Sequence, residues 1–371
     1  MKKKGLVIIH SPKELHQFVW YYCNKGKKIN WDVLCMPNGE KKEYIHKHCE
    51  AAGIFSNVII SDKSFFWSSI FQKIKVFLSM LFYFIIGQQK KLCRKFLNAL
   101  VRLDDYDELV VACNTGIIVG SCIVLGEEKN VVILDDGLGE YQEKTKWISI
   151  DKLRSPYYIE GLILSRMGYC SPGFFYFEAE KNCTKYSYYP EKMIYRNYKK
   201  ILPLFADEGT DLELYDKLLR RVYPLLNSFN FNDAEAIFFT HPMKDYSSDY
   251  EKYVRRFEAF VSNKYSRIFI KKNPYEISSY EFDDHVVCKE IDSSIPAEVL
   301  LPYLKNLDVY ILVCSSILMS TKALDLKFRI IDFEGIREEN LEKGLYKYPS
   351  EKDVRHFCDN FSSGKYEIIV I

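Results

Sequence analysis

The sequence predicts an α/β protein made of two doubly wound, Rossmann-like domains that face a cleft. The chain has 371 residues, whereas a single domain usually holds roughly 100 to 200. In both halves, short β-branched apolar runs alternate with stretches long enough for helices. Continuous apolar strands separated by helices are typical of a parallel sheet that is covered on both faces.

The first domain is expected over residues 1–205 and the second over residues 206–371. Apolar runs predict strands of the first domain at Gly5–Ile9, Trp31–Cys35, Asn57–Ile60, Glu108–Ala112 and Asn130–Leu134. Strands of the second are predicted at Ala236–Thr240, Arg267–Lys271, Asp308–Val313 and Phe328–Asp332, with helices at Leu212–Leu226, Ser248–Asn263 and Pro296–Asn306. Ligands of such sheets bind outside the carboxyl ends of the strands, so functional residues should follow these runs.

Composition and charge exclude several classes of protein. Hydrophobic residues make up 48% of the chain and charged residues 27%, which is typical of a folded globular protein and not of a disordered one. The formal net charge is only +2, so no global field would hold a nucleic acid. The 11 cysteines include no CxxC pair, which fits reduced thiols in the cytoplasm. The apolar run Gly5–Ile9 is too short for a signal-peptide core.

The segment 70–95 carries an apolar run between basic flanks. Val76–Gly87 is almost wholly apolar, with lysines before it and lysines and Arg94 after it. A membrane span needs about 20 apolar residues, so this run is too short to cross a bilayer. Two alternatives remain. One is a membrane-associating helix on an anionic leaflet, and the other is a buried core helix with solvated ends.

The strongest candidate for chemistry is Asp135-Asp136-Gly137, directly after the predicted strand Asn130–Leu134. Adjacent carboxylates repel each other, which favours proton uptake by one of them and suits it to general-base work. The glycine lets a substrate approach the backbone. The alternative is an ordinary surface turn, for which Asp-Gly is a common dipeptide.

Two candidates in the second domain point to a nucleotide. Ser315-Ser316 lies between a predicted strand and a helical stretch, where hydroxyls and backbone N–H groups can cradle a phosphate. A plain N-cap serine is the alternative. Glu298 lies in the first turn of a predicted helix, where its carboxylate can accept hydrogen bonds from ribose hydroxyls or can simply begin the helix.

Two strand ends carry polar residues before a proline. His241 follows the strand that ends at Thr240, and a histidine there can act as an acid or as a phosphate donor. Lys271 and Asn273 precede Pro274, and the asparagine amide can donate only a neutral hydrogen bond. Strand-ending X-Pro turns are the alternative at both places. The sequence contains no Walker loop, GxGxxG or GxSxG motif, which leaves nucleotide hydrolysis, dinucleotide binding and the common esterase mechanism without support.

Taken in order, these motifs resemble those of the bacterial sialyltransferases of glycosyltransferase family 52 and of the related capsular polysialyltransferases. Asp135-Asp136-Gly137 is similar to the acidic-acidic-Gly motif of their first domain, and Ser315-Ser316 is similar to the Ser-Ser motif of their second. Pro203–Phe205 resembles their inter-domain stretch. One position departs from the pattern, because Asn273 stands where the family's Lys-x-His-Pro turn has histidine, and His241-Pro242 lies one strand earlier.

The resemblance implies an inverting glycosyltransferase of the GT-B type. It would transfer sialic acid, or a related nonulosonic acid, from a CMP-sugar to a cell-surface glycan such as lipooligosaccharide or capsular polysaccharide. Asp135 would take the proton of the acceptor hydroxyl, and Asp136 would support the loop. Ser315 and Ser316 would hold the CMP phosphate, and Glu298 would accept from the ribose.

The resemblance does not decide which residue assists the departing phosphate, and it implies neither a metal nor a cofactor. Either His241 takes the role of the family histidine, or Lys271 and Asn273 stabilise the phosphate without proton transfer. The enzyme would work in the cytoplasm, with the segment 70–95 on the inner face of the cytoplasmic membrane. Two alternatives remain, namely the same scaffold with a UDP-sugar donor and a non-catalytic homologue that binds a nucleotide or glycan.

Overall fold

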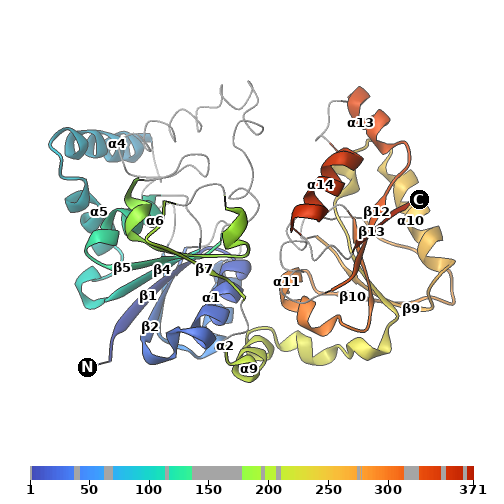
Figure 1. Cartoon of the computed structure of the whole chain (residues 1–371), viewed down its shortest axis with the longest axis horizontal. Helices are drawn as coiled ribbons and strands as arrows, with labels where there is room; N and C mark the ends of the chain where they lie inside the picture. The colour runs from blue at the N-terminus through green and yellow to red at the C-terminus, as the bar shows by residue number, and fades with distance from the viewer. Residues whose placement is uncertain are drawn as a thin grey trace. The chain divides into compact units, whose positions relative to one another are not determined.

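Two parallel β-sheets with helices packed around them make up the described part of the chain (Figure 1). The structure, a computed structural model, describes residues 2–36, 42–61, 70–112, 117–135, 178–193, 197–205, 210–273, 276, 278–312, 326–343, 348–361 and 366–371. The chain divides into a first unit, Met1–Tyr223, and a second unit, Pro224–Ile371. The predicted fold class of two doubly wound α/β domains is confirmed.

The first unit contains a seven-stranded sheet in the order β3-β2-β1-β4-β5-β6-β7. All its strand pairs are parallel. The order reverses between β1 and β4, which is where ligands of doubly wound sheets usually bind. The strands are β1 (Lys4–Ile9), β2 (Asn30–Cys35), β3 (Phe55–Ile60), β4 (Glu108–Val111), β5 (Asn130–Ile133), β6 (Thr184–Ser187) and β7 (Lys200–Pro203).

Helices cover both faces of the first sheet (Figure 1). One face carries α1 (Pro12–Asn24), α2 (Lys42–Ala52) and α9 (Leu212–Val222), and the other carries α5 (Gln89–Asn98) and α6 (Ile117–Val124). On that second side, α4 (Ile70–Ile85) packs against α5. Burial on both faces explains why β1, β4 and β5 read as continuous apolar runs. Gly5 of β1 is required by close packing, because a Cβ there would lie 2.4 Å from the buried Trp31 ring.

The second unit contains a six-stranded parallel sheet in the order β10-β9-β8-β11-β12-β13. Its strands are β8 (Ala236–Phe239), β9 (Arg267–Lys271), β10 (Val287–Ile291), β11 (Asp308–Leu312), β12 (Phe328–Asp332) and β13 (Tyr366–Val370). Its helices are α10 (Tyr250–Ser262), α11 (Ala297–Leu300), α13 (Ile336–Lys343) and α14 (Glu351–Phe361). Stacked aromatic rings fill its core, with Phe238 and Tyr310 at 4.6 Å between centroids.

Four strands were not predicted: β6, β7, β10 and β13. β10 lies at an edge of its sheet and exposes four of its five residues, so it lacks the apolar run that marks a buried strand. β6 contains Lys185 between Thr184 and Tyr186, and this lysine is fully buried. A short strand with a buried charge has no recognisable pattern in the sequence.

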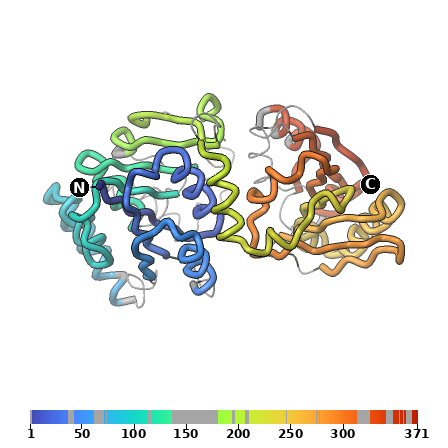
Figure 2. Tube along the Cα trace, turned by 90° about the horizontal axis from the view of Figure 1, so that it is seen from below, coloured from blue at the N-terminus to red at the C-terminus, as the bar shows by residue number. Residues whose placement is uncertain are grey.

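The helix α9 belongs to the first unit, whereas the sequence placed it in the second domain. The expected boundary at 205/206 therefore precedes the division after Tyr223. α9 packs against α1 and α2 (Figures 1 and 2), and its apolar face, including Leu218 and Val222, is buried there. Asp211 caps α9 by accepting a hydrogen bond from the Leu214 N–H at 3.0 Å.

The helix α4 is exposed on the outside of the first unit. Met80 is buried, but Phe71, Phe82 and Ile85 are 78%, 57% and 71% exposed. α4 packs against α5 (Figure 1). The core-helix alternative for the apolar run is therefore wrong. Over the described ranges, no helix has the length and apolar character needed to cross a membrane.

Candidate functional site

Asp135 lies at the carboxyl end of β5 in the first unit, as predicted. Its side chain is 1% exposed, and its Oδ2 accepts a hydrogen bond from the Tyr188 N–H at 3.0 Å. The Gln17 Nε2, from α1, donates to the Asp135 carbonyl at 3.0 Å. Tyr188 therefore holds the carboxylate and Gln17 holds the backbone of Asp135, at the edge of the sheet where ligands of doubly wound sheets usually bind.

The partners of Asp135 are themselves held by aromatic packing. Gln17 Nε2 also donates to the Tyr188 hydroxyl at 3.2 Å. The Tyr188 ring stacks on Phe205 with 5.5 Å between centroids. Phe205 has a φ of 60°, a left-handed conformation that is strained in a bulky residue. Its ring also packs on His16 at 5.1 Å and on Trp20 at 5.5 Å, contacts that hold it in this conformation.

Lys185 is a residue of this site that the sequence did not reveal. It lies on β6, beside β5, and its side chain is fully buried. Its Nζ donates a hydrogen bond to the Leu134 carbonyl at 2.9 Å, directly before Asp135. A buried ammonium group needs close polar partners. Its position brings positive charge to the backbone that carries the Asp135 carboxylate.

The loop after β1 contributes a second polar group to the same edge of the first sheet. Ser11 caps α1 by accepting from the Glu14 N–H at 3.4 Å. The Glu14 Oε2 accepts from the His10 N–H at 2.5 Å and lies 3.2 Å from the His10 Nδ1. Because β1 borders the point where the strand order reverses, His10 and Glu14 lie at the edge of the sheet where ligands of doubly wound sheets usually bind.

In the second unit, the ends of β8 and β9 are joined directly. The Thr240 N–H donates to the Lys271 carbonyl at 3.1 Å, and the two strands pair along their length. His241 follows Thr240 immediately, and its half-buried ring packs on Tyr246 with 5.3 Å between centroids. Although His241 lies one strand earlier in the sequence than Lys271, the two therefore stand at neighbouring strand ends.

Lys271 lies among carboxylates at this edge of the second sheet. Its side chain is 4% exposed, and burial lowers the pKa of Lys271 to about 8, while the charges of Asp292, Glu298 and Glu290 act in the opposite direction. Its Nζ donates to the Lys272 carbonyl at 3.0 Å. Lys271 and Glu298 were predicted as separate candidate residues, and the structure places them in one cluster.

Asp292 also belongs to this cluster, and the sequence analysis missed it. It follows β10, the edge strand that was not predicted. Hydrogen bonds from Ser294, one of them from the backbone N–H at 2.7 Å, lower the pKa of Asp292. Glu298 lies in the first turn of α11, as expected, and is 8% exposed.

The remaining predicted residues have different outcomes. Asn273 follows Lys272, and its carbonyl accepts from the Glu276 N–H at 2.9 Å. Asp136, Ser315 and Ser316 lie outside the described residues. Across the described ranges, no three His, Cys, Asp or Glu side chains are grouped so that they could hold a metal ion.

Comparison with known proteins gives solved structures of low similarity. No family model matches the chain, and no match is found among curated proteins. The glycosyltransferase SnogD from Streptomyces nogalater is 11% identical, with a TM-score of 0.47 over 99% of this chain and 97% of that one. A UDP-N-acetylglucosamine 2-epimerase is 10% identical, with a TM-score of 0.47 over 98% and 92% of the two chains. MurG from Acinetobacter baumannii is 8% identical, with a TM-score of 0.44 over 99% and 86%. Likeness at this level assigns neither a family nor an activity.

Proposed function

We propose that this chain is an inverting glycosyltransferase that moves sialic acid, or a related nonulosonic acid, from a CMP-sugar to a cell-surface glycan. The observation that carries the proposal is the placement of Asp135. This carboxylate is buried at the carboxyl end of β5 and is fixed by the Tyr188 N–H. A general base must be held within hydrogen-bond reach of the hydroxyl that it deprotonates, and a fixed buried carboxylate meets that need.

In the proposed reaction, the acceptor hydroxyl attacks the anomeric carbon of the donor. A new C–O bond forms as the bond from that carbon to the CMP phosphate oxygen breaks, and the anomeric centre inverts. Asp135 takes the proton of the attacking hydroxyl. The electron pair of the broken bond leaves with CMP, so negative charge develops on its phosphate.

The second unit supplies groups suited to that leaving nucleotide. Lys271 is a buried lysine of this cluster and would stabilise the phosphate, while Glu298 would accept from the ribose hydroxyls. Ser315 and Ser316 would add hydroxyl donors to the phosphate. His241 stands at the strand end next to Lys271, which favours His241 over Asn273 for the role of the family histidine, because only the histidine can deliver a proton.

The acceptor class in this proposal is a lipooligosaccharide or a capsular polysaccharide, as the motif resemblance implies. Both are hydroxyl-rich glycans, so the reaction needs only one correctly placed hydroxyl near Asp135. His10 and Glu14, at the carboxyl end of β1 in the same unit, are suited to bind sugar hydroxyls there.

Calorimetric titration with CMP, UDP and ADP tests the donor assignment. We expect the wild type to bind CMP and neither UDP nor ADP. A Ser315→Ala, Ser316→Ala double variant should not bind CMP. The control is Ser228→Ala, Ser248→Ala, which removes two exposed serines of the same unit and should bind CMP as the wild type does.

Two other results of the titration would assign a different function to the chain. Selective UDP binding, with turnover of UDP-sugars and not of CMP-sugars, would keep the transferase and replace its donor. Absence of binding by all three nucleotides, together with an Asp135→Ala variant that fully replaces the wild type in the cell, would instead identify a non-catalytic protein.

A further inference from the structure

An apolar stripe runs along the outward face of α4. It consists of Phe71, Ile74, Leu78, Phe82 and Ile85, which are 78%, 52%, 56%, 57% and 71% exposed. We call these five residues the α4 stripe. Their spacing of three or four residues places them within about 80° of arc at 100° per residue. The buried Met80 projects from the opposite side of the same helix.

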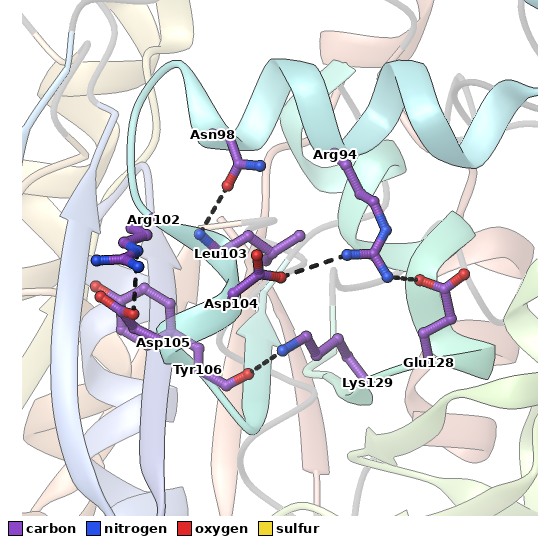
Figure 3. Close-up of polar contacts among 9 residues, drawn as sticks. All are labelled: Arg94, Asn98, Arg102, Leu103, Asp104, Asp105, Tyr106, Glu128 and Lys129. Atoms are coloured by element: carbon purple, nitrogen blue, oxygen red, sulfur yellow. Dashed lines mark hydrogen bonds and ion pairs between the residues drawn. The ribbon is translucent and has the colours of Figure 1, made fainter.

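The neighbouring helix α5 anchors α4 to the first unit. The apolar face of α5 is buried, and α5 packs against α6. Arg94 contacts Asp104 Oδ1 at 3.4 Å and pairs with Glu128 through its other terminal nitrogen (Figure 3). The Asn98 Oδ1 accepts from the Leu103 N–H at 2.8 Å (Figure 3). Because Arg94 and Asn98 tie α5 to the segments around Asp104 and Glu128, α4 presents the stripe from a defined position.

The charges on this helical pair are positive only. Neither α4 nor α5 contains an aspartate or a glutamate. Lys75 on α4, and Lys91 and Lys95 on α5, are exposed to solvent. An apolar stripe on a helix with lysines beside it suits the boundary between acyl chains and anionic headgroups. Exposed apolar surface of this continuity marks an interaction site and not an ordinary solvated face.

We propose that the α4 stripe binds an anionic lipid surface with α4 lying in the plane of the interface. α4 has 16 residues and is about 24 Å long at 1.5 Å per residue, which is shorter than the roughly 30 Å hydrocarbon core of a bilayer. It can therefore lie along a leaflet but cannot cross it. The stripe would insert its aromatic and aliphatic side chains while the exposed lysines contact phosphate groups.

A second copy of the chain is a poorer occupant of the same face. A symmetric dimer through the α4 stripe would bring the α4 and α5 lysines of both copies together. Neither helix offers an acid to offset them, so the like charges would repel. An anionic leaflet supplies the negative charge that this face lacks.

Cosedimentation of the full chain with vesicles tests this inference without any assay of activity. One set of vesicles contains phosphatidylglycerol and phosphatidylcholine, and the other contains phosphatidylcholine alone. The test variant is Phe82→Asp, Ile85→Asp. The control variant, Leu212→Asp, Leu225→Asp, adds the same charge at side chains that are 51% and 47% exposed away from α4.

We expect the wild type and the control variant to bind the phosphatidylglycerol vesicles, and the α4 variant to bind them at least tenfold more weakly. Binding should weaken as salt screens the lysines. Lys91→Gln, Lys95→Gln should reduce the preference for phosphatidylglycerol while leaving the stripe intact. In a Phe82→Trp variant, bromine-labelled acyl chains should quench the fluorescence of the added tryptophan. This measurement does not depend on a charged variant that could unfold.

Three results would overturn the inference. The first is a wild type that does not cosediment with phosphatidylglycerol vesicles. The second is equal binding by the α4 variant and the control variant. The third is a dimer, measured by light scattering, that only the α4 variant dissociates, which would assign the stripe to a second copy of the chain.

Discussion

The Nζ of Lys185 donates a hydrogen bond to the carbonyl of Leu134 at 2.9 Å, although 51 positions separate the two residues in the sequence. This contact connects β6 to the residue that precedes Asp135. It places a buried cation beside the backbone of the candidate general base. In the proposed reaction, Lys185 would therefore be a positioning residue that acts through Asp135 and not through the substrate.

Replacing Lys185 should lower the rate of transfer while leaving donor binding unchanged. We expect Lys185→Met to reduce kcat by about 10- to 100-fold, since misplacement of a catalytic group by about 1 Å can cost on the order of 100-fold. CMP affinity should stay at the wild-type value, because Lys185 lies in the first unit. Lys185→Arg, which keeps the charge, should recover part of kcat. A fall in CMP affinity equal to the fall in kcat would contradict the positioning role.

Asp135→Asn should remove most of the transferase activity without unfolding the protein. The asparagine Oδ1 can still accept from the Tyr188 N–H, but the amide cannot take a proton. Loss of a general base typically costs about 10²- to 10⁴-fold, so kcat should fall by that range in a donor hydrolysis or transfer assay. The control is Asp249→Asn, at an exposed aspartate before α10. Equal activity of the two variants would rule Asp135 out as the base.

Nucleotide binding should weaken above pH 8 because Lys271 loses its proton there. Burial lowers the pKa of Lys271 to about 8, so the side chain is a cation below this pH and neutral above it. The second ionisation of a phosphate monoester, near pH 6, is already complete. We expect the CMP dissociation constant to rise roughly tenfold for each pH unit above about 8. Lys271→Arg should keep binding constant from pH 7 to pH 10, and a wild-type constant that does not change over this range would exclude Lys271 from the phosphate site.

Stability should fall in acid because His16 is buried in its neutral form. Burial, followed by the charge of Lys13, lowers the pKa of His16 to about 3, from 6.5. The unfolded chain therefore binds more protons between these values, so the free energy of unfolding decreases as pH falls from 6.5 toward 3. The loss is on the order of 4 kcal/mol over the full window.

Urea denaturation of the wild type and of His16→Gln at pH 7 and pH 5 measures this effect. The wild type should lose more stability than the variant between the two pH values. Because His16 on α1 contacts Tyr215 on α9, the same experiment probes the packing of α9 on the first unit. If the wild type and His16→Gln lost the same free energy of unfolding between pH 7 and pH 5, a group other than His16 would be responsible for the loss.

Apart from the exposed edge strand β3, the strands that the sequence predicted are largely buried, and their surroundings therefore restrict them to apolar residues. Both faces of β4 and β5 are buried, so each must be a continuous apolar run, and such runs separated by helices determine the fold class. The position of Asp135 at a strand end follows from the same pattern. Glu298 was also placed correctly, because a proline followed by an acid is typical of a first helical turn.

The sequence could not determine which segments share a surface. The apolar run of α4 is compatible with burial or exposure, and only the packing of α5 against α6 leaves α4 outside. The apolar face of α9 needs a partner, and tertiary contacts assign that partner to α1 and α2. Lys185 lies on β6, which is too short to be recognised, and Asp292 follows β10, which is too exposed to be recognised. Each gains its role from a residue on or directly after a neighbouring strand. The sequence therefore determined the alternation of elements and the residues at their ends, because both follow from local physical chemistry. The tertiary structure decided burial, unit membership and the partners of each charge, because these depend on contacts between residues far apart in the chain.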